Sequence, residues 1–193
     1  MLFRLEHGKR AYCADFASYG VAVIGMTALL LMAGPREQRW SLALFAGSGL
    51  MGWTLIEYLL HRFVLHGLQP FQGWHAAHHD RPTALICTPT VFSAGLFAVL
   101  VWLPAILLLG RWPALALTLG VLSGYLAYTV THHLTHHRRP RNSWLAQRKR
   151  WHAAHHQAHH ARQPVCFGVT TGLWDRVFGS ANALAAAPAR KTE

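Results

Sequence analysis

Four segments of about twenty mostly apolar residues constrain the fold of this chain most strongly. They run from Phe16 to Gly34, from Trp40 to Leu60, from Thr88 to Gly110 and from Trp112 to Thr131. A bilayer core is spanned by about 20 apolar residues in a helix, so each segment is long enough to cross it. Very short connections join the first segment to the second and the third to the fourth. The sequence therefore predicts an all-α protein built on a bundle of four transmembrane helices in two hairpins.

Basic residues are distributed unequally over the two sides of this predicted bundle. Four spans place both termini and the central loop on one side, which then carries fifteen of the eighteen Lys and Arg residues. The other side carries three, namely Arg36, Arg39 and Arg111. Because basic loops remain in the cytoplasm, both termini are predicted to be cytoplasmic, in a bacterial inner membrane or the endoplasmic reticulum. The net charge of +11 could also indicate nucleic-acid binding, but the apolar segments and the lack of any such motif argue against it.

Fourteen of the fifteen histidines fall in two blocks, each following a pair of apolar segments. Each block contains a His-x-x-His-His run, beginning at His75 and at His152, and each run is preceded by other spaced histidines. Imidazole is the commonest transition-metal ligand in proteins. The blocks therefore predict a metal site in a histidine-rich helical cap on the cytoplasmic side.

Helical spacing selects the candidate ligands. Residues at i, i+3 and i+4 share a helix face, so all three histidines of each His-x-x-His-His run can point one way. His61 and His66 are five apart, which on an α-helix separates them by about 140°. Either the helix loosens near His61 or the two histidines serve different metals. The ten candidates are His61, His66, His75, His78, His79, His132, His136, His152, His155 and His156. One ion takes about four to six ligands, so ten candidates predict two ions.

The spacing leaves one choice open in the second block. His133 and His137 have the same i, i+4 spacing as His132 and His136, so either pair could bind metal. His159 and His160 extend the last run and are possible additional ligands.

Acidic residues are few around these histidines, which argues against a carboxylate-bridged site. Glu57 lies one turn before His61 and is expected to accept a hydrogen bond that orients this imidazole. The alternatives are that Glu57 pairs with Arg62 or Arg81, or that it binds the metal directly. Asp175 is expected to be an ordinary cytoplasmic acid.

Two further features concern the organisation of the protein. Gly120-x-x-x-Gly124 and Ser48-x-x-x-Gly52 permit close helix packing. Residues 1–180 are expected to form one integral-membrane domain. Residues 181–193, alanine-rich and polar at the end, are expected to form a disordered tail.

Five stretches of the sequence together resemble a known family. They are WTLIEYLLHRFVLH at 53–66, HAAHHDRP at 75–82, YTVTHHLTHH at 128–137, WHAAHH at 151–156 and FGVTTGLWDRVFG at 167–179. Within residues 50–180 the protein resembles the membrane-bound fatty acid hydroxylase and sterol desaturase superfamily, and fatty acid 2-hydroxylases in particular.

The resemblance implies a four-helix membrane bundle with a cytosolic cap that holds a histidine-rich dimetal centre. Such proteins use dioxygen and two electrons to hydroxylate or desaturate C–H bonds of lipids. The resemblance selects His132 and His136 as the ligand pair and carries over the other eight candidates. It implies two iron ions, although histidine sites also accept zinc in purified samples.

The sequence also departs from the fatty acid 2-hydroxylase pattern. About fifteen residues precede the first span, too few for the cytochrome b5 domain common in those enzymes. A separate electron donor, such as a ferredoxin or cytochrome b5, is therefore expected. His133 stands where Tyr is common and Thr135 where Leu is common.

The favoured interpretation is an oxygen-dependent hydroxylase that inserts one oxygen atom into a C–H bond of a lipid acyl group. A desaturase, or a sterol or carotenoid hydroxylase of the same superfamily, is the alternative. Metal transport or storage is a third possibility. It is disfavoured because the histidines gather at one end of the spans and transport would place ionisable groups at mid-membrane.

Overall fold

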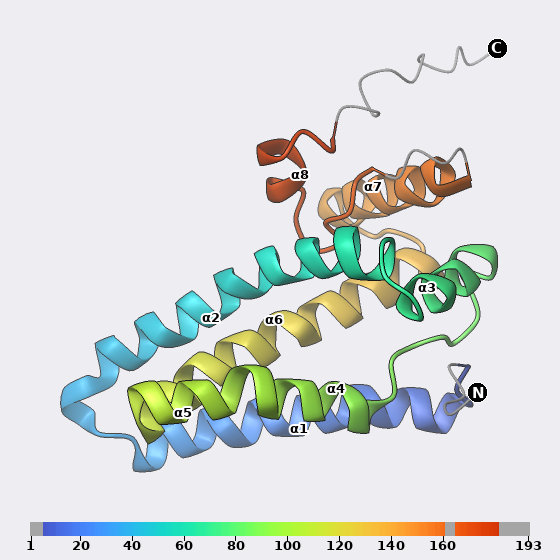
Figure 1. Ribbon diagram of the computed structural model, residues 1–193. Coiled ribbons are helices and arrows are strands. Elements are labelled where there is room, and N and C mark those ends of the chain that lie inside the picture. Colours follow the sequence, from blue (N-terminus) through green and yellow to red (C-terminus); the bar gives the residue numbers. More distant parts are fainter. Residues whose placement is uncertain (1–5, 161–164, 182–193) are drawn as a thin grey trace. The chain divides into compact units, whose positions relative to one another are not determined.

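The computed structural model describes residues 6–160 and 165–181, which are predominantly helical (Figure 1). Within these ranges the one β contact is a single bridge between Glu6 and Ile86. The predicted all-α class is confirmed. Of the expected tail at 181–193, all but Ala181 lies outside the described residues, as do the side chains of His159 and His160.

The four predicted spans are confirmed as four helical segments long and apolar enough to cross a membrane. The first is α1 (Lys9–Ala33), and the second combines η1 (Arg36–Gln38), α2 (Arg39–Leu59) and the π-helical turn η2 (Leu60–Leu65). The third combines α4 (Thr90–Phe97), the π-helical turn η3 (Ala98–Trp102) and α5 (Leu103–Leu109), and the fourth is α6 (Arg111–His137). Both α1 and α6 extend well beyond their apolar segments, because polar residues continue the same helices.

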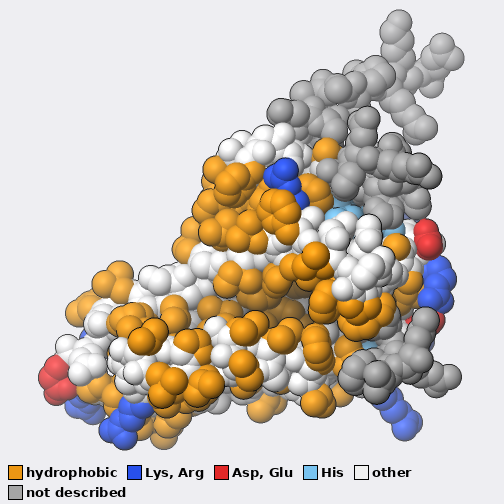
Figure 2. Space-filling model, viewed as in Figure 1, with side chains coloured by type: hydrophobic (Ala, Val, Ile, Leu, Met, Phe, Trp, Pro, Cys, Tyr) orange, Lys and Arg blue, Asp and Glu red, His pale blue; other side chains and the backbone are white. Residues whose placement is uncertain are grey.

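Large apolar side chains on these helices face outward. Leu31, Met32 and Leu108 are 81%, 87% and 81% exposed, respectively. Figure 2 shows hydrophobic side chains over the visible faces of α1, α4 and α5. A contiguous apolar surface of this kind suits lipid contact. The protein is a multi-pass integral membrane protein.

The protein divides into two compact units. The membrane unit comprises Met1–Trp53 and Thr83–Val130, and the histidine unit comprises Thr54–Pro82 and Thr131–Glu193. The histidine unit contains α3 (Phe71–Asp80), α7 (Ser143–His160) and α8 (Leu173–Val177), together with η2 and the ends of α2 and α6. The expected single domain to residue 180 stays a prediction.

An aromatic cluster joins four helices at the core of the membrane unit. Tyr125 of α6 lies 4.8 Å from Tyr19 of α1, 5.3 Å from Trp53 of α2 and 5.0 Å from Phe97 of α4, measured between ring centroids. The rings of all three pairs are steeply inclined, an arrangement favoured by the quadrupoles of aromatic rings. The Tyr19 hydroxyl forms a 2.7 Å hydrogen bond with the Ser93 hydroxyl, so this buried polar group is satisfied.

The third span accommodates a proline in its middle. Pro104 has no N–H, and its ring crowds the carbonyl four residues earlier. The backbone responds with the π-helical turn η3, in which the Leu103 N–H donates to the carbonyl of Ala98, five residues back. Gly110, with φ of 79°, then permits the sharp turn into α6.

Glycines bring the backbones of α2 and α6 into close contact within the membrane unit. A Cβ atom added at Gly120 would lie 2.0 Å from the carbonyl oxygen of Ala46, and one at Gly49 would lie 2.2 Å from that of Leu117. A Cβ at Gly124 would lie 2.5 Å from the Cβ of Trp53. The close packing expected at Gly120 and Gly124 is confirmed. On α2 the contact is made by Gly49, whereas Gly52 faces open space.

Gly120→Ala should therefore destabilise the protein, because the added methyl group collides with backbone atoms that cannot rotate away. We expect the free energy of unfolding to fall by about 1–3 kcal/mol, measured by denaturation in detergent. Gly52→Ala is the matched control and should be near neutral or slightly stabilising. Equal stability of the two variants would contradict the backbone contact.

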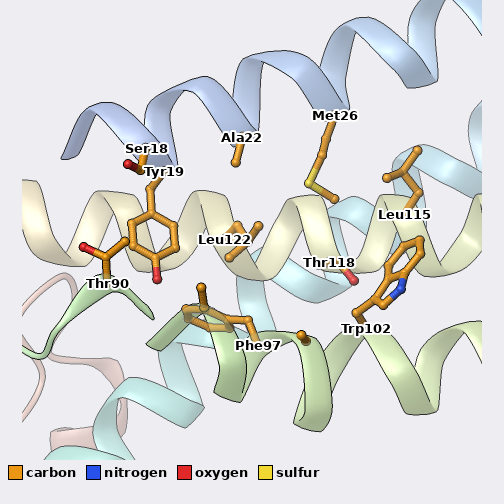
Figure 3. A pocket seen from close by; sticks show the side chains of 12 residues that line it. Ser18, Tyr19, Ala22, Met26, Thr90, Phe97, Trp102, Leu115, Thr118 and Leu122 are labelled. Atoms are coloured by element: carbon orange, nitrogen blue, oxygen red, sulfur yellow. The ribbon is translucent and has the colours of Figure 1, made fainter. Parts of the chain in front are cut away.

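The membrane unit also contains a cavity of about 420 Å³ among α1, α4, η3 and α6. Figure 3 shows Met26, Phe97 and Leu122 among its lining side chains. Hydroxyl groups line it at Ser18, Tyr19, Thr90 and Thr118, but the lining is predominantly apolar. Its size and chemistry suit a hydrocarbon chain.

Candidate metal centre

Nine of the ten candidate histidines form two groups within the histidine unit. In each group, one ligand nitrogen from every residue lies within 4.8 Å of all the others. The five-histidine group consists of His61, His66, His75, His79 and His155. The four-histidine group consists of His78, His136, His152 and His156.

Three elements supply the five-histidine group. His61 and His66 come from η2 and its C-cap, His75 and His79 from α3, and His155 from α7. The Nε2 atom of His75 lies 3.0 Å from that of His61 and 3.0 Å from that of His79. The Nε2 atom of His155 lies 3.1 Å from that of His66 and 3.2 Å from that of His79. Metal–nitrogen bonds of about 2.0–2.1 Å place neighbouring ligand nitrogens roughly 3 Å apart, so this convergence fits one ion.

The four-histidine group is built similarly from α3, α6 and α7. The Nε2 atom of His152 lies 2.8 Å from that of His136 and 3.1 Å from that of His156. The His78 ring centroid lies 4.8 Å from that of His136 and 5.2 Å from that of His156. These four imidazoles therefore surround a second position of the same chemistry.

The π-helical turn resolves the uneven spacing of His61 and His66. Hydrogen bonds in a π-helix join residues five apart, so the wider turn brings both imidazoles to one side. Their ring centroids lie 5.2 Å apart in the same group. Of the two alternatives, the helix therefore loosens near His61.

Each His-x-x-His-His run divides between the two groups. The spacing predicts that the three histidines of a run point one way, but only the i, i+4 pair of each run stays together. His75 and His79 join the five-histidine group and His78 joins the other. On α7 the pair His152 and His156 joins the four-histidine group, and His155 joins the five-histidine group. Both helices therefore lie along the boundary between the two groups.

Burial keeps these imidazoles neutral. Burial, and after it the neighbouring imidazoles of His156 and His137, lower the pKa of His78 to about 3. The pKa values of His75, His152 and His155 are also well below the ordinary value, first because of burial and then because of adjacent histidines. A neutral imidazole is the form that binds metal, so the site can accept ions at neutral pH without losing protons.

The structure distinguishes the two histidine pairs between which spacing could not choose. His136 belongs to the four-histidine group, and the Nε2 atom of His132 lies 3.1 Å from that of His78 and 3.2 Å from that of His136. His132 therefore lies at the edge of this group. His133 and His137 stack on each other with ring centroids 4.5 Å apart, and neither joins a group.

Glu57 acts on the imidazole of His61 by a less direct route than expected. Its carboxylate accepts hydrogen bonds from the backbone N–H groups of Val169 and Thr170, at 2.6 and 2.9 Å, and from the Thr170 hydroxyl at 2.6 Å. The Nδ1 atom of His61 instead bonds at 2.5 Å to the carbonyl oxygen of Phe167. Glu57 thus holds the segment that contacts His61. The alternative partner Arg62 donates to the Tyr58 hydroxyl.

Asp175 is a functional candidate that sequence reasoning missed. The expectation of an ordinary cytoplasmic acid is wrong, since its side chain is fully buried and accepts four hydrogen bonds. The reason is that α8 carries Asp175 into the histidine unit, where it holds the same segment as Glu57. Its place in the FGVTTGLWDRVFG stretch was the available signal.

These features define a class: a multi-pass membrane protein with two groups of histidines, each of which could hold a metal ion. Comparison with known proteins makes the class more specific. The model of the fatty acid hydroxylase family matches residues 46–180. The protein belongs to the fatty acid hydroxylase family.

Several relatives are named as hydroxylases of fatty acids or fatty acyl groups. The sequence is 33% identical to the dihydroceramide fatty acyl 2-hydroxylase FAH2 of Arabidopsis thaliana, with a match over 76% of this protein and 64% of that one. It is 35% identical to the ceramide very long chain fatty acid hydroxylase scs7 of Schizosaccharomyces pombe, over 68% and 40%. It is 33% identical to human fatty acid 2-hydroxylase, over 70% and 40%. The match thus spans less than two thirds of the length of these relatives.

A solved structure shows the same fold. It is described as full-length scs7p with only the hydroxylase domain visible, and it superposes with a TM-score of 0.74 at 25% identity. The match covers 88% of this protein and 66% of that one.

Proposed function

We propose that this protein is an oxygen-dependent membrane lipid hydroxylase that inserts one oxygen atom into a C–H bond of a lipid acyl group. The convergence of nine imidazoles, five of them buried and four half-buried, into two groups, with a tenth at the edge, is the observation that carries this proposal. The names of the relatives favour carbon 2 of a fatty acyl group as the site of attack. The balanced reaction replaces C–H by C–OH while two electrons and two protons reduce the second oxygen atom of dioxygen to water.

We assign one ion to the five-histidine group and the other to the four-histidine group together with His132. Iron bound at these positions would supply the redox chemistry that activates dioxygen. The donor set fits this role, because imidazole is a suitable ligand for iron. Imidazole suits zinc equally well, so zinc can replace iron in purified samples. The protein's own contribution is to bury the site, keep the imidazoles neutral and fix their orientation.

The substrate and the electron donor follow from the chemistry of the surfaces. The apolar cavity of the membrane unit suits an acyl group. The net charge of +11 favours an acidic electron donor, such as a ferredoxin or cytochrome b5, at a cytoplasmic face. Product formation by the purified protein with each donor in turn would identify the partner.

Mass spectrometry of lipids from cells that express the wild type or His155→Ala tests the proposed function. We expect the wild type alone to produce a lipid with one added oxygen on its acyl group, because His155 is a fully buried member of the five-histidine group. Immunodetection in membranes should show equal amounts of both proteins. A product that lacks two hydrogens would instead indicate a desaturase. Identical lipid profiles in aerated cells that also contain a ferredoxin or cytochrome b5 would contradict the proposal.

A further inference from the structure

The segment from Val165 to Thr170, between α7 and α8, presents backbone carbonyls to the five-histidine group. The Phe167 carbonyl accepts from His61 Nδ1 at 2.5 Å, and the Val165 carbonyl accepts from His155 Nδ1 at 2.7 Å. A carbonyl oxygen can only accept, so both imidazoles must carry their proton on Nδ1. Their Nε2 atoms are then left with a lone pair directed at the group, which is the arrangement a metal requires.

Asp175 holds the first half of this segment. Its Oδ1 atom accepts from the Phe167 N–H and the Ser180 hydroxyl, both at 2.8 Å. Its Oδ2 atom accepts from the Gly168 N–H at 2.8 Å and from the indole N–H of Trp151 at 3.2 Å. A Cβ at Gly168 would lie only 2.9 Å from Oδ2 and 2.0 Å from the Thr171 carbonyl, so the backbone approaches this carboxylate as closely as glycine allows.

Glu57 holds the second half. Its Oε1 atom accepts from the N–H groups of Val169 and Thr170, and its Oε2 atom accepts from the Thr170 hydroxyl. Four consecutive N–H groups, those of residues 167–170, are therefore bound by two buried carboxylates. Each carboxyl group accepts several of these hydrogen bonds at once, so the segment is held at both halves.

We propose that Asp175 and Glu57 are positioning residues that fix the orientation and tautomer of His61 and His155 through the 165–170 segment, and that they thereby support metal binding selectively in the five-histidine group. This inference rests on the proposed function, because it requires these histidines to bind metal. The contacts to the 165–170 carbonyls are made by members of the five-histidine group. Among the described residues, none accepts a hydrogen bond from Nδ1 of His78 or His152.

The chemistry of the contacts distinguishes the two carboxylates. Both oxygens of Asp175 accept hydrogen bonds from backbone or indole N–H groups, which can only donate. In Asp175→Asn an N–H₂ group replaces one of these oxygens, so two donors face each other and that hydrogen bond is lost. In Glu57→Gln, the carbonyl oxygen can keep both backbone bonds while the N–H₂ group donates to the Thr170 hydroxyl, which can also accept. Asp80→Asn makes the same change as Asp175→Asn at an exposed position on α3 and is the matched control.

Titration of the purified, metal-depleted full-length protein with Co²⁺ tests the proposal, with calorimetry and visible absorption reporting each site. We expect the wild type and Asp80→Asn to bind two ions. Asp175→Asn should bind one ion as before and the other roughly 10- to 100-fold more weakly, with an altered spectrum for that ion alone. Glu57→Gln should stay within a few-fold of the wild type, and Glu57→Ala should show the selective loss.

The outcomes separate this proposal from the proposed function. A wild type that fails to bind two ions would overturn both. Two intact sites in Asp175→Asn, or equal weakening of both sites in a folded variant, would overturn only the positioning role. If Asp175→Asn does not fold, as judged by its helical circular dichroism, the contrast between Glu57→Ala and Glu57→Gln decides the question.

Discussion

Replacing His155 or His78 by alanine should abolish lipid hydroxylation and lower the metal content of the purified protein. The two variants should lose metal from different groups. His155 is fully buried, and its Nε2 atom lies 3.1–3.2 Å from those of His66 and His79. His78 is 5% exposed and belongs to the four-histidine group. Each truncation removes one imidazole and leaves its partners in a buried cavity without the full ligand set.

Elemental analysis gives the metal content of these variants, and lipid mass spectrometry gives their activity. We expect hydroxylated product to fall to background in both, while helical content and membrane insertion stay unchanged. His7→Ala is the control and should be near neutral, because His7 lies in the membrane unit and in neither histidine group. Full activity in both ligand variants would rule out the proposed centre. A large loss in His7→Ala would show that the site extends further than the two groups.

His132→Ala and His133→Ala should differ sharply although the two residues are adjacent. The Nε2 atom of His132 lies within 3.2 Å of those of His78 and His136, whereas the His133 ring stacks on that of His137. We expect His132→Ala to lose most of its activity and to bind the second ion more weakly. His133→Ala should keep both ions and most of its activity. His136→Ala and His137→Ala repeat the comparison one turn later.

The same assays of activity and metal content measure these four variants. A greater loss in His133→Ala and His137→Ala than in their neighbours would reverse the ligand assignment. Equal losses in all four would mean that the whole end of α6 matters structurally, and ligation would have to be assigned by spectroscopy of the bound metal.

Local patterns predicted the helices and the candidate residues of the site. The four spans follow from the length of the apolar segments, and the histidine blocks follow from i, i+4 spacing. The exact ends of the helices did not follow, because polar residues such as Lys9 and His137 continue a helix without any change in hydrophobicity that marks the boundary. The looser turn at His61 was foreseen only as one of two alternatives.

The division of the histidines into two groups and the contacts of the acidic residues depend on tertiary structure, which the sequence alone does not reveal. Spacing shows that His75, His78 and His79 can share a helix face. It does not show that His78 belongs to the four-histidine group while the other two belong to the five-histidine group. Likewise, no local pattern reveals that Glu57 binds the amides of residues 169–170, more than a hundred positions away. These contacts depend on how distant segments meet, and a single sequence carries no direct record of that.

The absence of acidic ligands from the two groups, among the described residues, has a consequence for redox chemistry. Neutral imidazoles add no negative charge, so two bound iron ions would keep their full positive charge in a buried, weakly screened environment. Such a setting would favour the ferrous over the ferric state, because the ion of lower charge is less disfavoured there. A donor of moderate reducing power would then suffice to prepare the centre for dioxygen.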